Sequence, residues 1–124
     1  MLDDLYREVI LDHYHNPRHA SRLQNPTVTE QGVNPLCGDE ITLDVAIKNG
    51  KVLDAAFVGQ GCAISQAAAS LLLDEVIGQS VSAVKAWKNE RHLALLSIDL
   101  TPTRMKCALL SLKTLQLALS QLPS

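Results

Sequence analysis

The sequence predicts a single α+β domain over residues 1–124, with a small antiparallel sheet and helices packed on one of its faces. Apolar and polar residues alternate over residues 41–48, as in a half-buried strand, whereas apolar residues recur at helical spacing near both ends of the chain. The chain has 124 residues, of which 47% are hydrophobic, enough for one core but not for two ordinary domains. Aromatic residues make up only 3%, so the core must be built mainly from Leu, Ile, Val and Ala.

The first 40 residues are expected to form a helix followed by a loop. Asp3 is a suitable N-cap for a helix over residues 4–15, and Pro17 follows its end. Residues 16–40 are rich in proline and polar residues, so we expect a loop with a short edge strand around residues 27–30.

A β-hairpin is predicted over residues 40–58, with its turn at Asn49-Gly50. A two-residue loop would divide the apolar residues between both faces of the hairpin. A three-residue loop, Lys48-Asn49-Gly50 with Gly50 left-handed, keeps them on one face and is the form we predict. This register pairs Val45 with Leu53, Leu43 with Ala55, and Ile41 with Phe57, and it places Asp44 opposite Asp54 on the exposed face.

The second half of the chain is expected to be helical. Cys62 begins a helix that runs to about Ile77, and Ser80 caps a short helix over residues 81–89. The pattern over residues 91–100 is ambiguous. Thr101-Pro102 predicts the start of a final helix. Its apolar stripe consists of Ala108, Leu112, Leu115, Leu119 and Leu122.

Composition argues against several classes of partner. The net charge is −2 and no basic stripe runs along the chain, so we do not expect nucleic-acid binding. The early acids and the lack of a long apolar run predict neither a secretory signal nor a membrane span. Three cysteines is an odd number, which favours reduced thiols and a cytoplasmic location.

The cysteines and one carboxylate form a candidate metal site. Cys37 precedes the first hairpin strand and Cys62 follows the second, so antiparallel pairing brings both to one end of the sheet. Asp39 is two residues from Cys37, and Cys107 lies at the border of the apolar stripe of the last helix. Three thiolates and a carboxylate could complete a tetrahedral zinc site or hold an iron–sulfur cluster with one weak ligand.

Other interpretations of these residues remain open on spacing alone. A free cysteine is often a small buried hydrophobe, and Cys107 on a Leu-rich helix is equally consistent with plain core. His13, His15 and His19 cluster near the end of the first helix, where we expect solvated histidines rather than a second metal site.

Four segments carry a resemblance to a known family. They are residues 14–19 (Tyr-His-Asn-Pro-Arg-His), 34–39 (Asn-Pro-Leu-Cys-Gly-Asp), 59–65 (Gly-Gln-Gly-Cys-Ala-Ile-Ser) and Lys106-Cys107. In this order and spacing they closely resemble the U-type iron–sulfur cluster assembly proteins, that is IscU, SufU and the N-terminal part of NifU. The resemblance implies thiolate ligands at Cys37, Cys62 and Cys107, a carboxylate ligand at Asp39, and a cysteine desulfurase as partner.

The chain combines features of two branches of that family. IscU-like members carry histidine where Lys106 stands, and Lys106 resembles SufU-like members instead. However, only 44 residues separate Cys62 from Cys107, which resembles the IscU length without the extra SufU segment. Residues 100–104 match the chaperone-docking motif of IscU poorly, so the resemblance gives little support for a dedicated Hsp70-type partner.

Three functions follow from these features. The first is a scaffold, rather than an enzyme, that builds a transient [2Fe–2S] cluster and transfers it to apo iron–sulfur proteins. The second is a zinc-dependent sulfur acceptor, in which Cys37 takes persulfide from a SufS-type desulfurase. The third is a structural zinc-binding interaction domain without sulfur chemistry.

Overall fold

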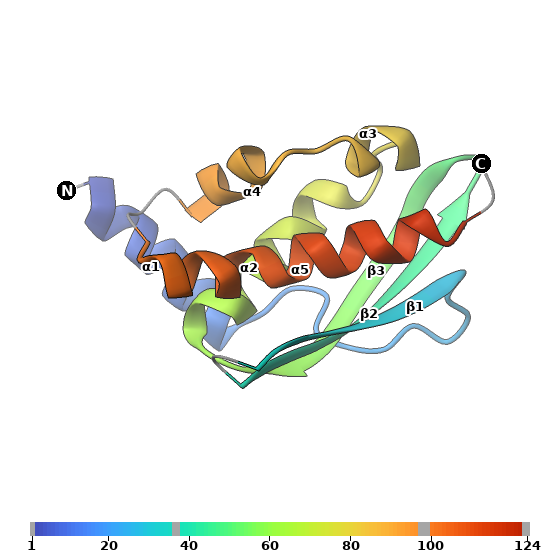
Figure 1. The fold of residues 1–124 in the computed structure, drawn as a ribbon. Helices are drawn as coiled ribbons and strands as arrows, with labels where there is room; N and C mark the ends of the chain where they lie inside the picture. The colour runs from blue at the N-terminus through green and yellow to red at the C-terminus, as the bar shows by residue number, and fades with distance from the viewer. Residues whose placement is uncertain (1, 36–37, 97–99, 123–124) are drawn as a thin grey trace.

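The computed structural model describes residues 2–35, 38–96 and 100–122, and it confirms the predicted α+β class. Five helices and three strands are assigned within these residues (Figure 1). In chain order they are α1 (Leu2–His15), β1 (Val28–Asn34), β2 (Asp39–Lys48), β3 (Lys51–Gln60), α2 (Ala63–Val76), α3 (Val81–Lys85), α4 (Asn89–Leu96) and α5 (Pro102–Ser120).

The helices lie on one side of an antiparallel sheet with strand order β1-β2-β3 (Figure 1). α5 packs on β1 and β2, α2 packs on β3, and the remaining helices contact α2 or α5. The core lies between the sheet and these two helices, and its largest fully buried members include Leu43, Val45, Phe57, Leu72, Leu112 and Leu115. Aliphatic residues supply almost all of this core, as the composition predicts.

Most predicted helix boundaries are confirmed, with local differences. The Ser80 hydroxyl accepts a hydrogen bond from the Ala83 N–H at 3.2 Å, and Thr101 caps α5 in the same way. α1 begins at Leu2, so Asp3 lies inside the helix rather than at its cap. α3 ends at Lys85, earlier than expected, and most of the ambiguous segment forms α4. The predicted edge strand is present as β1 and extends further, to Asn34.

The predicted hairpin register is wrong, because the strands carry a β-bulge. The turn is a two-residue loop, in which Asn49 (φ 55°) and Gly50 (φ 74°) are both left-handed and Lys48 pairs with Lys51. The register then shifts between Ala46 and Ile47, which restores one apolar face without the three-residue loop. Val45 consequently pairs with Ala55, Leu43 with Phe57, and Ile41 with Gly59. Leu53, expected opposite Val45, is 60% exposed.

Asp44 is fully buried, which corrects the prediction that it faces Asp54 in solvent. The loop between α1 and β1 covers this face of the sheet, and its Arg22 guanidinium donates to both Asp44 oxygens at 2.6 and 3.1 Å. The Thr29 hydroxyl and the Leu23 N–H donate as well. Burial by itself would raise the pKa of Asp44, but these hydrogen bonds outweigh it and lower the pKa.

We expect Asp44→Asn to destabilise the fold by about 2–3 kcal/mol, because an amide cannot accept all four donors and leaves the Arg22 charge without its partner. Asp54→Asn on β3 is the matched control, since Asp54 is exposed, and it should stay within about 0.5 kcal/mol of the wild type. Urea unfolding of the metal-free proteins measures both, and equal midpoints for the two variants would contradict the role given to Asp44.

His92 is a buried polar residue of the helical layer, at 1% exposure. Its Nε2–H donates to the Ala108 carbonyl of α5 at 2.8 Å, whereas Nδ1 has no hydrogen-bond partner among the described residues. Burial disfavours the imidazolium and lowers the pKa of His92 to about 4, although the hydrogen bond to Ala108 opposes this shift. The ring is therefore neutral at pH 7 and joins α4 to α5.

The stability of the metal-free protein should fall as the pH drops from about 6.5 to about 4. The folded pKa of His92, about 4, lies below the ordinary histidine value of 6.5, so between these values the unfolded chain binds a proton that the folded chain excludes. This linkage amounts to about 3 kcal/mol. His92→Gln retains an N–H donor without titrating, and its unfolding free energy should depend less on pH; identical pH profiles would rule out the linkage.

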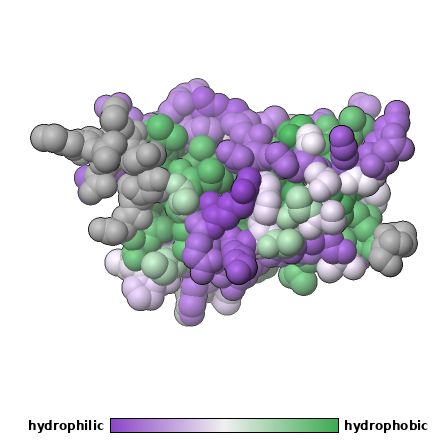
Figure 2. Space-filling model, turned by 90° about the horizontal axis from the view of Figure 1, so that it is seen from above, coloured by the Kyte–Doolittle hydropathy of each residue, from purple (hydrophilic) through white to green (hydrophobic). Residues whose placement is uncertain are grey.

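The outer surface of the helical layer is mixed in character. Seen from above, hydrophilic residues run across much of this face with apolar residues to either side (Figure 2).

Trp87 is half-buried against the core, and the Arg91 guanidinium lies 4.2 Å from its ring centroid. Trp87 therefore packs partly against the core, with Arg91 over the face of its ring. Among the described residues, no helix is long and apolar enough to cross a membrane.

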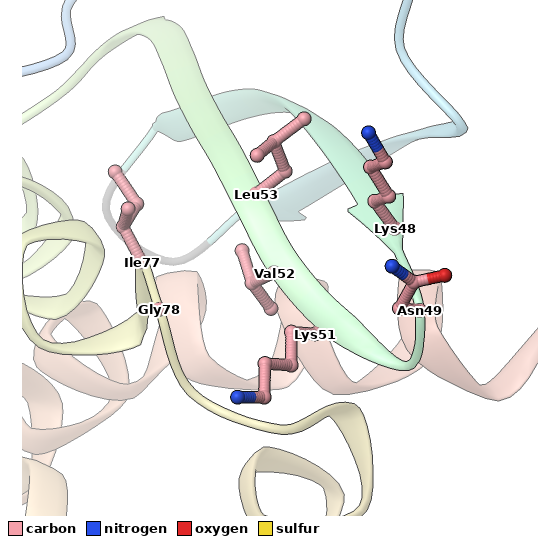
Figure 3. A pocket seen from close by; sticks show the side chains of 7 residues that line it. All are labelled: Lys48, Asn49, Lys51, Val52, Leu53, Ile77 and Gly78. Carbon is pink, nitrogen blue, oxygen red and sulfur yellow. The ribbon is translucent and has the colours of Figure 1, made fainter.

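Two hollows lie beside the turn between β2 and β3. One has a volume of about 380 Å³ and is lined by the hairpin and by Ile77-Gly78 (Figure 3). The other, of about 700 Å³, lies between the turn, α3 and Leu122. Neither is lined by a cysteine, histidine or carboxylate, so the residues suited to metal chemistry lie elsewhere.

Candidate metal centre

The end of the sheet opposite the hairpin turn brings Asp39 and Cys62 together. Asp39 is the first residue of β2, and β3 ends at Gln60, opposite Glu40. Gly61 then leads into Cys62, the N-cap residue of α2. Antiparallel pairing thus places Cys62 beside the start of β2, as predicted. Cys37, the other cysteine expected here, lies outside the described residues.

Asp39 is fully buried, and only one of its two carboxylate oxygens has a hydrogen-bond partner among the described residues. Its Oδ1 accepts a hydrogen bond from the Cys62 N–H at 3.0 Å. Its Oδ2 is buried and has no hydrogen-bond partner among the described residues. An unsatisfied buried carboxylate oxygen is costly, so an oxygen in this position is well suited to bind a cation.

The two cysteines differ in exposure. Cys107 lies one turn and a half into α5 and is only 2% exposed, where the side-chain amide of Asn34 donates to its sulfur at 3.9 Å. Cys62, at the beginning of α2, is exposed. Cys107 is therefore enclosed by the protein, whereas solvent reaches Cys62.

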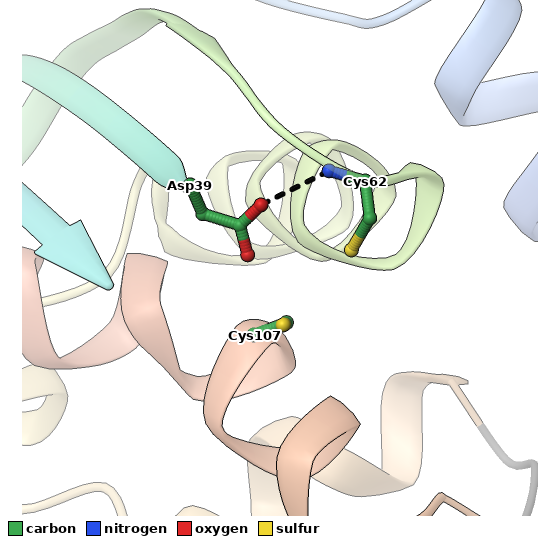
Figure 4. Close-up of side chains that lie close together, drawn as sticks. All are labelled: Asp39, Cys62 and Cys107. Atoms are coloured by element: carbon green, nitrogen blue, oxygen red, sulfur yellow. Dashed lines mark hydrogen bonds between the residues drawn. The ribbon is translucent and has the colours of Figure 1, made fainter. Parts of the chain in front are cut away.

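Asp39, Cys62 and Cys107 converge on one space between β2, α2 and α5 (Figure 4). A carboxylate oxygen and the two Sγ atoms all lie within 4.8 Å of one another. Tetrahedral zinc bonds to sulfur and oxygen at about 2.0–2.3 Å, which puts its ligands about 3.5–4 Å apart. The three atoms therefore fit one metal ion after small movements, and the donor set suits zinc or iron. The structure thus places Cys107 beside Asp39 and Cys62, and its role as a metal ligand stays a prediction.

Gly61 allows the carboxylate to lie this close to the helix. A Cβ atom built on Gly61 would collide with Asp39 Oδ1 and would lie 2.7 Å from Ser65 Oγ. The residue also has a positive φ of 155°. A side chain at this position would push Asp39 away from the N-terminal end of α2. Glycine before Cys62 is therefore required both by this packing and by its positive φ.

Gly61→Ala should weaken zinc binding by roughly 10- to 100-fold, because it displaces the carboxylate of Asp39, a predicted metal ligand that also accepts the Cys62 N–H. Gly78→Ala is the control: it also has a positive φ (94°), but no atom lies within 4 Å of the added Cβ. The Gly78→Ala variant should lose about 1 kcal/mol of folding stability and keep the zinc affinity of the wild type. Competition with a chromophoric chelator gives both affinities, and an unchanged value for Gly61→Ala would refute this account.

The histidines near the end of α1 do not form a second metal site among the described residues. The Arg18 N–H donates to Ser70 Oγ at 2.9 Å, which leaves the Ser70 hydroxyl free to donate to His13 Nδ1 at 2.7 Å. His19 Nε2 contacts Asp74 at 2.8 Å. His13 is buried and joins α1 to α2, so the expectation that it is solvated is wrong, whereas His15 is exposed as predicted.

Asn34 is the residue at this site that sequence reasoning did not identify. It is buried on a strand whose other residues are half-buried or exposed, and it donates to a candidate ligand. Its position in Asn-Pro-Leu-Cys-Gly-Asp was visible in the sequence, but its contact with Cys107, 73 residues away, depends on how α5 crosses β1.

Comparison with known proteins identifies the family. Residues 5–124 match the model of the NifU-like N terminal domain. Because this match spans nearly the whole chain, the protein belongs to that family, as the sequence motifs indicated.

Similar proteins are found in both the IscU and the SufU branch of the family. The chain is 38% identical to "Iron-sulfur cluster assembly scaffold protein IscU" of Thermotoga maritima, over 95% of this chain and 94% of that protein. It is 36% identical to "Zinc-dependent sulfurtransferase SufU" of Bacillus subtilis, over 93% and 89% of the two chains. The crystal structure of a putative scaffold protein for the SUF system from Fervidobacterium islandicum superposes with a TM-score of 0.76 at 29% identity, covering 90% and 94%.

Proposed function

We propose that this protein is an iron–sulfur cluster assembly scaffold that receives sulfur from a cysteine desulfurase, builds a [2Fe–2S] cluster and transfers it to apo-proteins. The observation that carries the proposal is the convergence of two cysteine sulfurs and a half-satisfied buried carboxylate, within 4.8 Å of one another, at the end of the sheet. The similarity to an IscU scaffold over almost the full length of both chains supports it.

Each residue has a proposed role with respect to the cluster, which is the cargo of this protein. The buried Cys107 is the fixed ligand, and the exposed Cys62 is the ligand that partners reach. Asp39 supplies a hard oxygen donor, which binds a soft iron–sulfur unit less tightly than a thiolate and so favours release. Cys37, two residues from Asp39 in the sequence, is proposed as the fourth ligand and as the thiol that receives sulfur.

Lys106 is not proposed as a ligand. It is exposed, whereas its neighbour Cys107 is buried, and adjacent helical positions point about 100° apart. A protonated amine also has no lone pair to offer a metal. The site therefore depends on Asp39 rather than on a residue beside Cys107. Thiolate chemistry of this kind needs reducing conditions, which is why we propose the cytoplasm as its location.

A second function, the zinc-dependent sulfur acceptor, is favoured by one observation: the chain is also similar to a zinc-dependent sulfurtransferase. In this alternative zinc holds the thiolates between reactions. The Cys37 thiolate attacks the outer sulfur of the desulfurase persulfide, the sulfur–sulfur bond breaks, and the desulfurase cysteine leaves as a thiolate. The same donor set serves both functions, so the experiment must measure sulfur and iron separately.

We expect anaerobic reconstitution to give about two irons and two sulfides per chain, and Asp39→Ala to hold this cluster longer and to transfer it more slowly, since the weakest donor is removed. The decay of the visible absorbance in the presence of an apo-acceptor measures transfer. Asp54→Ala is the control, because Asp54 is an exposed carboxylate on β3. Equal transfer rates for Asp39→Ala and wild type would refute the role of Asp39 as the labile ligand.

The same preparations separate the two functions. Zinc-loaded protein without iron is added to the cognate desulfurase, and alanine release is measured. Little stimulation together with two irons and two sulfides supports the scaffold. Strong stimulation that disappears in Cys37→Ser supports the sulfur acceptor instead. If the protein neither stimulates the desulfurase nor assembles a cluster, but still binds zinc, the site would be a structural zinc centre.

A further inference from the structure

We infer that Asn34 is a positioning residue of the metal centre, whose side-chain N–H donates to the Cys107 sulfur and withdraws charge from it when it acts as a ligand. The inference rests on the metal centre of the proposed function and adds a residue from outside the ligand set. It starts from an unusual feature of β1: the one buried residue of this strand is a polar asparagine, 8% exposed, whereas its neighbour Val33 is 60% exposed.

The position of Asn34 is fixed by two elements. It pairs with Asp39 in the β1–β2 register, so it lies beside the residue that begins β2. It also shares a face of β1 with Gly32, because alternate residues of a strand point the same way. A Cβ atom on Gly32 would collide with Thr114 Oγ1 of α5, so this face of β1 lies directly against α5. Asn34 therefore points toward the helix that carries Cys107.

The contact itself is a hydrogen bond of 3.9 Å from Asn34 Nδ2 to Cys107 Sγ. Sulfur is a large and weak acceptor as a thiol, but a thiolate is a charged acceptor, and hydrogen bonds to charged groups are stronger. The Asn34 amide is thus placed to donate to Cys107 when Cys107 acts as a thiolate ligand. Hydrogen bonds to ligand sulfurs also lower their electron donation, which is a recognised means of tuning a metal centre.

The three ligands consequently differ in their surroundings. Asp39 is anchored through one oxygen by the Cys62 N–H, Cys107 is buried and receives the Asn34 amide, and Cys62 is exposed. Asn34 makes Cys107 the sulfur that stays in place while the cargo is exchanged. A residue with this role should affect the spectrum of the bound metal, which a residue that only supports the strand would not do.

Cobalt(II) in place of zinc provides this test, because its thiolate charge-transfer bands report the electron density on sulfur. Asn34→Leu has a similar volume and no N–H donor. We expect its sulfur-to-cobalt band to move to lower energy and its zinc affinity to fall about 10- to 100-fold. Gln31→Leu is the matched control, since it removes an amide from an exposed position of the same strand, and its band and affinity should equal those of wild type.

Thermal unfolding of the metal-free proteins separates this role from a structural one. A lower melting temperature of Asn34→Leu with an unchanged cobalt band would overturn the inference. If Asn34→Leu fails to fold, Asn34→Asp replaces it: this variant keeps the shape but places an acceptor against the sulfur, and we expect the same band shift and a larger loss of affinity. A wild-type protein that binds cobalt through thiolates but assembles no cluster would overturn the proposed function and leave the inference intact.

Discussion

The hydrogen bond from the Cys62 N–H to Asp39 Oδ1 joins the first residue of β2 to the beginning of α2, and the candidate metal centre depends on it. It engages one oxygen of a carboxylate that has no exposure to solvent, whereas the other oxygen has no hydrogen-bond partner among the described residues. Burying a carboxylate in this way is costly. The bond is possible only because Gly61 has no side chain and because antiparallel pairing returns β3 to the same end of the sheet.

Much of this arrangement could be predicted from sequence because it depends on local patterns. Alternating apolar residues defined β2 and β3, and Thr101-Pro102 defined the beginning of α5. To predict that Asp39 and Cys62 converge, it was enough to know that two antiparallel strands lie between them. That argument does not depend on the register, which explains why it succeeded although the register itself was wrong.

The predictions failed where a residue is determined by a distant partner. A β-bulge inserts one residue into β3, and the alternation of apolar residues cannot distinguish a bulge from a longer loop. Asp44 was assigned to solvent because strand periodicity does not reveal that a loop covers the second face of the sheet and supplies Arg22. His13 was misjudged for the same reason, since Ser70 lies 57 residues away. In the last two cases a polar residue is buried with its partners, and sequence spacing does not encode those partners.

The unequal burial of the proposed ligands has a consequence for any cargo that the site would hold. A site that must load and unload cannot enclose its contents as a structural zinc site does, but it needs at least one ligand that holds its position throughout. Cys107, within α5 and almost inaccessible, meets the second requirement. Cys62, the exposed N-cap residue of α2, meets the first requirement. In the proposed function Asp39 is a metal donor, and the same carboxylate accepts the hydrogen bond from the Cys62 N–H. A movement of this side chain would therefore affect both the cargo and the backbone that positions Cys62.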